Sequence, residues 1–335
     1  MLAWFAERYL DEAVELFALL EVPRRVGSGG AVRREHRNLD LIVPLPGLAP
    51  VVIENKVFSL PDDRQLVDYS AAGFAGFKDP TLILLSLIPP SWPDRCLLTA
   101  HGTWRWVGYG ELADALAPVA RKLAESHDPI RRFAGDLLVH YVEMVRQLCQ
   151  LVKLVGSPGS DDPVDFGEAT KRKLRDARVH DGLGKLRARL IEHRLRTEVG
   201  VEVGGHEIKW DSGFTRGGPL LEGFVLLSNR DQVGWQYQQG QWRLAVRLAV
   251  VTGLPGGSAS QHAYVAERYR RYFDFAPLAE ILGGEVGAGS KAEVANDFNR
   301  FDPGFVYRYR KVPGLKVSQM RRLASEYLDL AAQLD

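Results

Sequence analysis

A pair of opposite charges follows directly on an apolar run in residues 51–59, which read VVIENKVFS. Glu54 and Lys56 stand two residues apart, so their side chains share one face of an extended strand. Asn55 turns its side chain to the other face, but its main-chain carbonyl stays at the same edge. Asp40 stands at the head of the preceding apolar run, LDLIV. If the two runs pair as antiparallel strands, Asp40 and Glu54 meet at one edge of a sheet.

These residue types suit the hydrolysis of a phosphodiester bond. Two carboxylates and a carbonyl are hard oxygen ligands, which favour Mg²⁺ or Mn²⁺ over zinc. A lysine beside the metal can orient or deprotonate a water molecule for attack on phosphorus, and the metal neutralises the developing charge. Taken alone, Glu54 and Lys56 are more typical of a surface ion pair at a strand end, which is worth under about 1 kcal/mol.

The elements that must position these residues follow from the periodicity of apolar side chains. Residues 3–21 have the spacing of an amphipathic helix. Strands are predicted at 31–37, 38–45 and 49–58, then a helix at 59–77 and a continuously apolar strand at 79–90. Two further helices are predicted at 111–125 and 129–154. The order over residues 3–90 is therefore helix, strand, strand, strand, helix, strand.

Asp40 followed by Glu54-Asn55-Lys56, on two neighbouring strands, resembles the D…(D/E)xK core of the PD-(D/E)XK nuclease superfamily. The predicted element order matches that superfamily's αβββαβ core. The segment VIENK is similar to a branch of stand-alone bacterial proteins, as is the first helix, MLAWFAERYL. The resemblance covers at most residues 1–150.

A second motif adds to this resemblance. Gln65 and Tyr69, in RQLVDY, are similar to the QxxxY motif that some members carry on the following helix. At positions i and i+4 the two side chains share one helical face. In the family this face looks toward the active site, so the resemblance implies that Gln65 and Tyr69 position a phosphate or brace the site.

The resemblance implies a restriction-endonuclease-like α/β fold and a Mg²⁺-dependent (or Mn²⁺-dependent) endonuclease, a hydrolase acting on DNA. Asp40 and Glu54 would ligate the metal, the Asn55 carbonyl would complete the protein ligands, and Lys56 would handle the water and the transition-state charge. A role in restriction, anti-phage defence or repair goes with this activity.

Many members also use an acidic residue on the first helix. Glu12 and Glu15 qualify here, as does Glu35 on the first predicted strand, and the sequence does not choose among the three. Two rival functions are left open. One is a non-catalytic protein that binds nucleic acid or has a regulatory role on a nuclease fold, and the other is the same enzyme directed at RNA.

The length and composition of the whole chain of 335 residues bear on its domain organisation and partners. Its length favours two domains, and the linker-like segment at 156–163 divides a nuclease domain (1–155) from an α+β accessory domain of unknown role (160–335). The net charge of +1 indicates no polyanionic partner by itself, so contacts with nucleic acid must come from local clusters. The two isolated cysteines, the lack of a secretory signal and the lack of a long apolar run predict a cytoplasmic protein without a membrane partner. A protein partner or self-association is left open.

Three segments are ambiguous as nucleic-acid contacts. RREHR (33–37) is as typical of a solvated strand edge as of a phosphate contact. Residues 171–196 hold ten Lys or Arg against three acids, which predicts either a phosphate-facing surface or a solvated helix face. Trp235, Tyr237 and Trp242 could stack on bases, although a hairpin that packs these aromatics on its own core is the favoured interpretation.

Overall fold

The computed structural model describes residues 1–25, 29–36, 39–59, 63–71, 77, 79–90, 92–155, 158–249, 258–284, 286–287, 289, 298–301 and 304–335. The chain divides into two compact units, Met1–Leu154 and Val155–Asp335, and each is described on its own. Both units combine helices and strands, so the protein is of mixed α/β class. None of the helices in the described ranges has the length and apolar composition needed to span a lipid bilayer.

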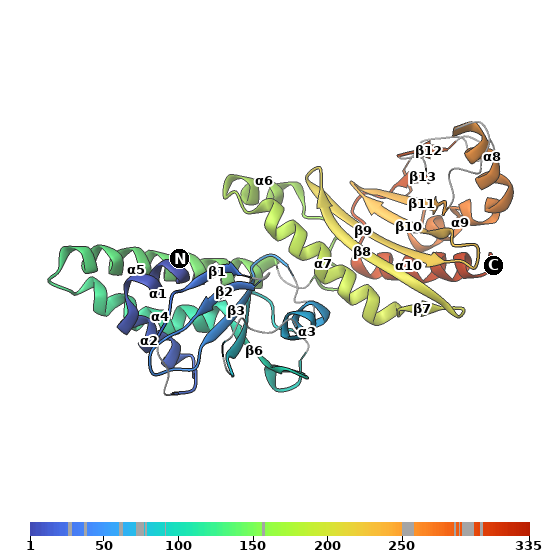
Figure 1. Cartoon of the computed structure of the whole chain (residues 1–335). Helices are drawn as coiled ribbons and strands as arrows, with labels where there is room; N and C mark the ends of the chain where they lie inside the picture. Colours follow the sequence, from blue (N-terminus) through green and yellow to red (C-terminus); the bar gives the residue numbers. More distant parts are fainter. Residues whose placement is uncertain are drawn as a thin grey trace. The chain divides into compact units, whose positions relative to one another are not determined.

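The N-terminal unit is built on a six-stranded mixed sheet with the order β1-β2-β3-β4-β6-β5 (Figure 1). β1 pairs with β2, β2 with β3 and β5 with β6 in antiparallel fashion, whereas β3 with β4 and β4 with β6 are parallel. The strands are β1 (Arg33–His36), β2 (Leu39–Val43), β3 (Val51–Lys56), β4 (Thr81–Ser86), β5 (Cys96–Thr99) and β6 (Gly102–Gly108).

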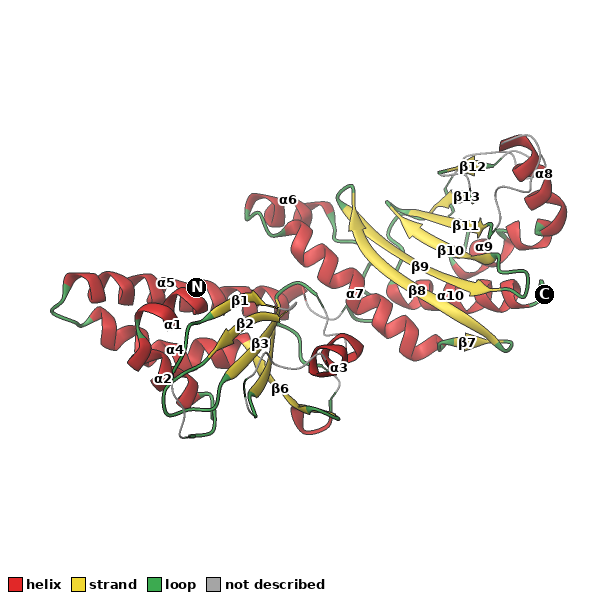
Figure 2. Ribbon diagram, in the orientation of Figure 1, coloured by secondary structure: helices red, strands yellow, loops and turns green. Residues whose placement is uncertain are grey.

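Helices cover both faces of this sheet, which explains why its central strands are continuously apolar. Val51 and Ile53 of β3 pack into the core shared with α1 (Leu2–Arg8), α2 (Leu10–Leu19), α4 (Tyr109–Ala124) and α5 (Pro129–Val155). Val52 points the other way and packs with Leu66 of α3 (Asp63–Ala71). Figure 2 shows α3 on one side of the sheet and the other four helices on the opposite side.

The elements predicted for residues 3–154 occur in the predicted order, with three differences in detail. The first helix is two helices, because Tyr9 (φ −130°, ψ 65°) interrupts the helical backbone. The helix predicted at 59–77 is observed as α3, while residues 60–62 and 72–76 lie outside the described residues. The hairpin β5–β6 was not predicted, because its strands are short and only Trp104 of its central residues is fully buried.

The C-terminal unit contains a seven-stranded antiparallel sheet with the order β12-β13-β11-β10-β9-β8-β7. The long helices α7 (His180–Val199) and α10 (Val317–Ala332) pack side by side on the sheet (Figure 1). The remaining helices are α6 (Glu168–Asp176), α8 (Ser258–Arg268) and α9 (Ala276–Ile281). The strands are β7 (Glu202–Val203), β8 (His206–Thr215), β9 (Gly218–Leu226), β10 (Gln232–Gln238), β11 (Gln241–Arg247), β12 (Asn299–Arg300) and β13 (Phe305–Lys311).

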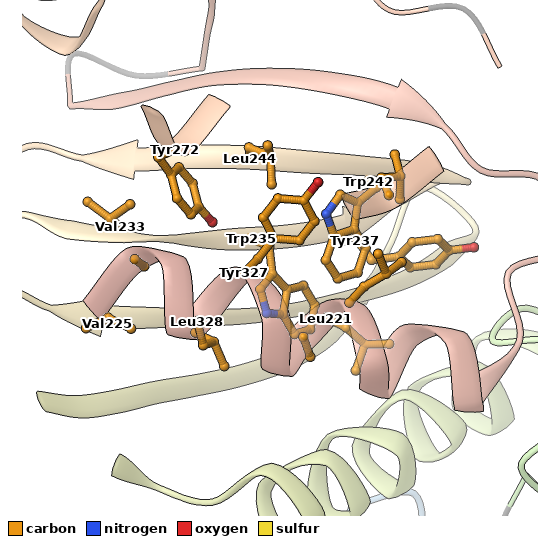
Figure 3. Packing of buried hydrophobic residues seen from close by; sticks show 14 of the residues in the cluster. Leu221, Val225, Val233, Trp235, Tyr237, Trp242, Leu244, Tyr272, Tyr327 and Leu328 are labelled. Atoms are coloured by element: carbon orange, nitrogen blue, oxygen red, sulfur yellow. The ribbon is translucent and has the colours of Figure 1, made fainter. Parts of the chain in front are cut away.

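The aromatic residues of the β10–β11 hairpin form the centre of the C-terminal core. The rings of Trp235 and Trp242 stack with centroids 4.6 Å apart, and Tyr327 of α10 packs against Trp242 (Figure 3). Tyr237 is also buried. The suggestion that these three hairpin aromatics stack on bases is therefore wrong, because positions 235, 237 and 242 all face the helices rather than the solvent.

Candidate functional site

Asp40 of β2 lies beside the C-terminal end of β3, opposite Glu54. β2 and β3 pair with Leu41 opposite Ile53, and the same register continued by one residue sets Asp40 opposite Glu54. Here the ladder ends, because the main-chain N–H of Asn55 donates to Oδ2 of Asp40 at 2.7 Å instead of to a main-chain carbonyl. The N–H and C=O of a strand residue point to the same side. The Asn55 carbonyl therefore points toward the strand that carries Asp40.

Glu54 and Lys56 form an ion pair that is shielded from water. Lys56 Nζ lies 2.7 Å from Glu54 Oε1, and the side chains are only 16% and 3% exposed. The interpretation of this pair as a surface ion pair is therefore wrong. Removing both charges from water is costly, and a pair kept in such a place is more typical of a functional site than of a stabilising contact. The second carboxylate oxygen, Oε2, is buried and has no hydrogen-bond partner among the described residues.

The electrostatic surroundings of Glu54 favour the neutral form of its carboxyl group. Burial raises the pKa of Glu54 above its ordinary value of 4.5, and the negative charge of Asp40 raises it further. The hydrogen bond and positive charge of Lys56 act in the opposite direction without cancelling the burial. A cation beside Glu54 and Asp40 would relieve both the desolvation and the like-charge repulsion.

Gln65 and Tyr69 of α3 continue the chain of polar contacts from Lys56. Lys56 Nζ donates to Gln65 Oε1 at 2.9 Å, and Gln65 Nε2 donates to the hydroxyl of Tyr69. Tyr69 also packs on the small core beneath α3. The structure thus brings Glu54, Lys56, Gln65 and Tyr69 together on one face of the sheet, with Asp40 and the Asn55 carbonyl at its edge.

A cavity of about 280 Å³ opens at the same edge, on the opposite face of the sheet. Asp40 and Asn55 line it, together with Tyr109 and Tyr141, which the sequence analysis missed. The hydroxyl of Tyr109 donates to Asn55 Oδ1 at 2.5 Å, and burial raises the pKa of Tyr109 and of Tyr141. Nothing near these tyrosines in the sequence marks them, because β6 and the helices after it are brought to the site only by the fold.

The three acids left open by the sequence lie in different surroundings. Glu35 lines the cavity with Asp40 and Asn55, and its backbone has the unusual φ of +48°. Glu12 is buried and ion-paired with Arg131. Glu15 is ion-paired with Lys122 at 2.8 Å. Of these three acids, only Glu35 lines the cavity beside Asp40, whereas Glu54 and Lys56 do not line that cavity.

The donor set is compatible with a divalent cation that has two carboxylate ligands. The described residues contain no group of three or more His, Cys, Asp or Glu side chains placed to hold a metal ion. Asp40, Glu54 and the Asn55 carbonyl would supply two carboxylates and one main-chain oxygen, which are ligand types that Mg²⁺ accepts. The buried, unpartnered Oε2 of Glu54 is the observation that fits an added cation.

The other basic segments singled out from the sequence divide into structural and exposed side chains. Arg187 is buried and donates to the carbonyl of Val164, and Arg194 bonds to Glu198 and Ser160. These arginines hold the helix α7 in its own unit, so the phosphate-facing interpretation does not apply to them. In β1 the side chains of RREH are largely exposed, and Arg34 pairs with Glu7, whereas Arg37 lies outside the described residues.

Comparison with known proteins adds no family to this geometry. The chain matches none of the protein-family models, curated proteins or solved structures with which it was compared.

Proposed function

We propose that the N-terminal unit is a metal-dependent endonuclease of PD-(D/E)XK type that hydrolyses phosphodiester bonds of DNA. The observation that carries the proposal is the buried Glu54–Lys56 pair with an unpartnered carboxylate oxygen and a second carboxylate, Asp40, beside it. The strand order β1-β2-β3-β4, with β3 and β4 parallel and α3 between them in sequence, supports the αβββαβ core that the resemblance implies.

In this proposal each polar group has a separate task. Asp40, Glu54 and the Asn55 carbonyl would hold Mg²⁺ or Mn²⁺, which would supply Lewis-acid stabilisation of the charge that develops on the phosphoryl group. The ammonium of Lys56 orients the attacking water and stabilises the same charge from the protein side. Gln65, itself bonded to Tyr69, fixes the position of that ammonium.

The proposal has consequences beyond the chemistry. A DNA-cleaving enzyme with two free cysteines, Cys96 and Cys149, suits the reducing cytoplasm. By the resemblance, its biological role is restriction, anti-phage defence or repair. Plating efficiency of phages on cells that express the wild type or the Lys56→Ala variant tests the defence role directly.

Cleavage by the purified full chain tests the activity. Supercoiled plasmid and single-stranded RNA are incubated with Mg²⁺, Mn²⁺ or EDTA, using the wild type, Lys56→Ala and Glu54→Ala. Lys122→Ala is the matched control, because Lys122 also pairs with a glutamate but is exposed on another part of the unit. We expect metal-dependent plasmid cleavage that each site variant lowers at least about 100-fold and that the control leaves unchanged.

The remaining outcomes separate the rival functions. Equal behaviour of the wild type and both site variants would show that the enzyme proposal is wrong. Salt-dependent DNA binding without any cleavage favours the non-catalytic binding protein, and cleavage of RNA alone favours the RNA enzyme. Calorimetric titration with Mg²⁺ gives a readout that needs no activity, since Asp40→Asn and Glu54→Gln should each weaken binding of the ion.

A further inference from the structure

The second face of the C-terminal sheet carries polar and aromatic side chains instead of a helix-packed core. The helices α7, α8 and α10 pack their buried apolar side chains into the core around Trp235. Because side chains alternate along a strand, the residues between those of the core point to the other face. We call this the glutamine face and define it by Gln232, Gln236, Gln238, Gln241, Arg243, Tyr307 and Tyr309. Its apolar residues form a small separate cluster of Phe224, Ala245 and Phe305.

Aromatic rings and a guanidinium lie side by side on the glutamine face. Tyr307 and Tyr309 of β13 stand two residues apart, and their rings are nearly parallel with centroids 6.5 Å apart. The Arg243 guanidinium lies 4.9 Å from the centroid of the Tyr307 ring. Both tyrosines are half-buried, so part of each ring is open to solvent. Such rows of rings and guanidinium planes are the surfaces on which unpaired bases stack.

The hydrogen-bond partners of Arg243 are neutral side chains, and the nearest carboxylate on this face, Glu222, reaches it only through Gln236. Arg243 donates to Oε1 of Gln236 at 2.7 Å and to Oε1 of Gln241 at 2.9 Å. The neighbouring Arg247, in contrast, is paired with Glu222 at 2.7 Å. Burial lowers the pKa of Arg243 from its ordinary value, and the guanidinium of arginine stays protonated in proteins. The glutamine face therefore presents the half-buried guanidinium of Arg243 beside the rings of Tyr307 and Tyr309.

Further cations gather at the end of the sheet nearest to Arg243. Gln239 in the β10–β11 turn donates to the carbonyl of Arg216 in the β8–β9 turn, so the two turns lie together. An Arg175 nitrogen from α6 lies 4.0 Å from the Cβ position of Gly217 in the same turn. Lys311 pairs with Gln241 across β13 and β11 at this end. Within the described part of the chain, Arg175, Arg216, Arg243 and Lys311 have no carboxylate at ion-pair distance.

We propose that the glutamine face and its basic end bind single-stranded DNA. Phosphates would meet Arg175, Arg216 and Lys311, and bases would stack on Tyr307 and Tyr309. The half-buried Gln232, Gln238 and Gln241 lie on the same face and could present amide groups to base edges, whereas Gln236 is buried and bonded within the sheet. A duplex hides the faces of its bases, so the ring pair selects for a single strand. The choice of DNA over RNA rests on the proposed function. The inference otherwise goes beyond it, because it assigns binding to the unit that lacks the Asp40–Glu54 edge.

Binding of fluorescent oligo(dT) to the full chain in EDTA tests the inference without cleavage. Tyr309→Ala should weaken binding about tenfold, as expected for the loss of one base–aromatic stack, whereas Tyr309→Phe keeps the ring and the affinity. Arg216→Gln and Lys311→Gln change exposed side chains and should each lower the salt dependence, by about 0.7 in the slope of log K against log salt. Arg322→Gln on α10 is the charge-matched control, since Arg322 is exposed on a helix of the opposite face.

Each outcome decides the inference. Unchanged affinity and salt slope in Arg216→Gln and Lys311→Gln, or equal losses in Arg322→Gln, would overturn it. Equal binding of duplex DNA overturns the stacking argument, and tighter binding of oligo(rU) overturns the choice of DNA. A failure of the proposed nuclease function can be told apart from a failure of this inference, because Lys56→Ala should abolish cleavage and leave oligo(dT) binding intact. If the chain binds oligo(dT) through the glutamine face but never cleaves DNA, this inference is supported and the proposed nuclease function is wrong.

Discussion

Lys56 of β3 and Gln65 of α3 are joined by a hydrogen bond of 2.9 Å between Nζ and Oε1. The same ammonium lies 2.7 Å from Glu54. Because an ammonium on a four-carbon stem is flexible, two partners on different elements restrict it far more than the ion pair alone. The helix α3 therefore contributes to the site through Gln65, which restricts the position of the Lys56 ammonium on β3.

Replacing Gln65 by alanine should slow cleavage with little effect on DNA affinity. Lys56 would keep its ion pair but lose its second anchor, so we expect kcat to fall about tenfold while KM stays within a factor of two. Single-turnover and steady-state plasmid cleavage measure the two constants. Asp68→Ala, an exposed change on the same helix, is the control. A rise in KM at constant kcat would contradict the positioning role.

Glu54 should make the N-terminal unit less stable as the pH rises. Its folded pKa is raised above 4.5, so the folded state binds more protons than the unfolded state from pH 4.5 up to the raised value. Stability therefore falls across that window as the pH rises. Urea unfolding at a series of pH values should show this slope in the wild type and not in Glu54→Gln.

The carboxylate of Glu111 provides a control of opposite sign. Its hydrogen bonds from Arg95 lower the pKa of Glu111, so its contribution to stability is present above 4.5 and is lost as the pH falls through the lowered value. Glu111→Gln should therefore flatten the acid side of the curve and leave the slope due to Glu54. Identical curves for the wild type and Glu54→Gln are the result that would contradict the assigned role of burial.

The three acids among which the sequence did not choose should differ in their effects on metal binding, cleavage and stability when each is replaced by glutamine. Glu35→Gln should weaken Mg²⁺ binding and cleavage, because Glu35 shares the cavity with Asp40. Glu12→Gln should lower stability by about 1 kcal/mol with cleavage retained. Arg131, which loses its ion-pair partner, is 42% exposed and can be hydrated. Glu15→Gln should change neither. Loss of cleavage in Glu12→Gln at unchanged stability would point to the first helix instead.

Trp235 should matter for folding and not for contact with nucleic acid. Trp235→Ala removes a fully buried indole from the centre of the C-terminal core and should destabilise that unit by about 3–5 kcal/mol. Trp235→Phe keeps most of the packing and should leave oligo(dT) binding unchanged. Chemical denaturation followed by circular dichroism measures the first effect, and fluorescence anisotropy measures the second. A selective loss of binding in the stable Trp235→Phe variant would restore the base-stacking interpretation.

Local patterns were sufficient for the main elements around the candidate site. Val51 to Ile53 are β-branched and apolar, and the side chains of a strand alternate, so the placement of Glu54 and Lys56 on one face follows from their spacing. The i, i+4 spacing of Gln65 and Tyr69 likewise requires only that the segment be a helix. For the same reason, Trp235 and Tyr237 had to share one face of any strand, and Gln236 between them had to point to the other.

Long-range packing decided the rest, since it depends on contacts between residues far apart in the chain. The sequence alone left open whether Glu54 and Lys56 were exposed, which of three acids approached Asp40, and which face of the β10–β11 hairpin was covered. Tyr109 meets Asn55 only because β6 lies beside β4 in the sheet, and Tyr307 meets Arg243 only because β13 pairs with β11. Periodicity specifies the faces of one element, but the partner that buries each face is chosen by the topology of the whole unit.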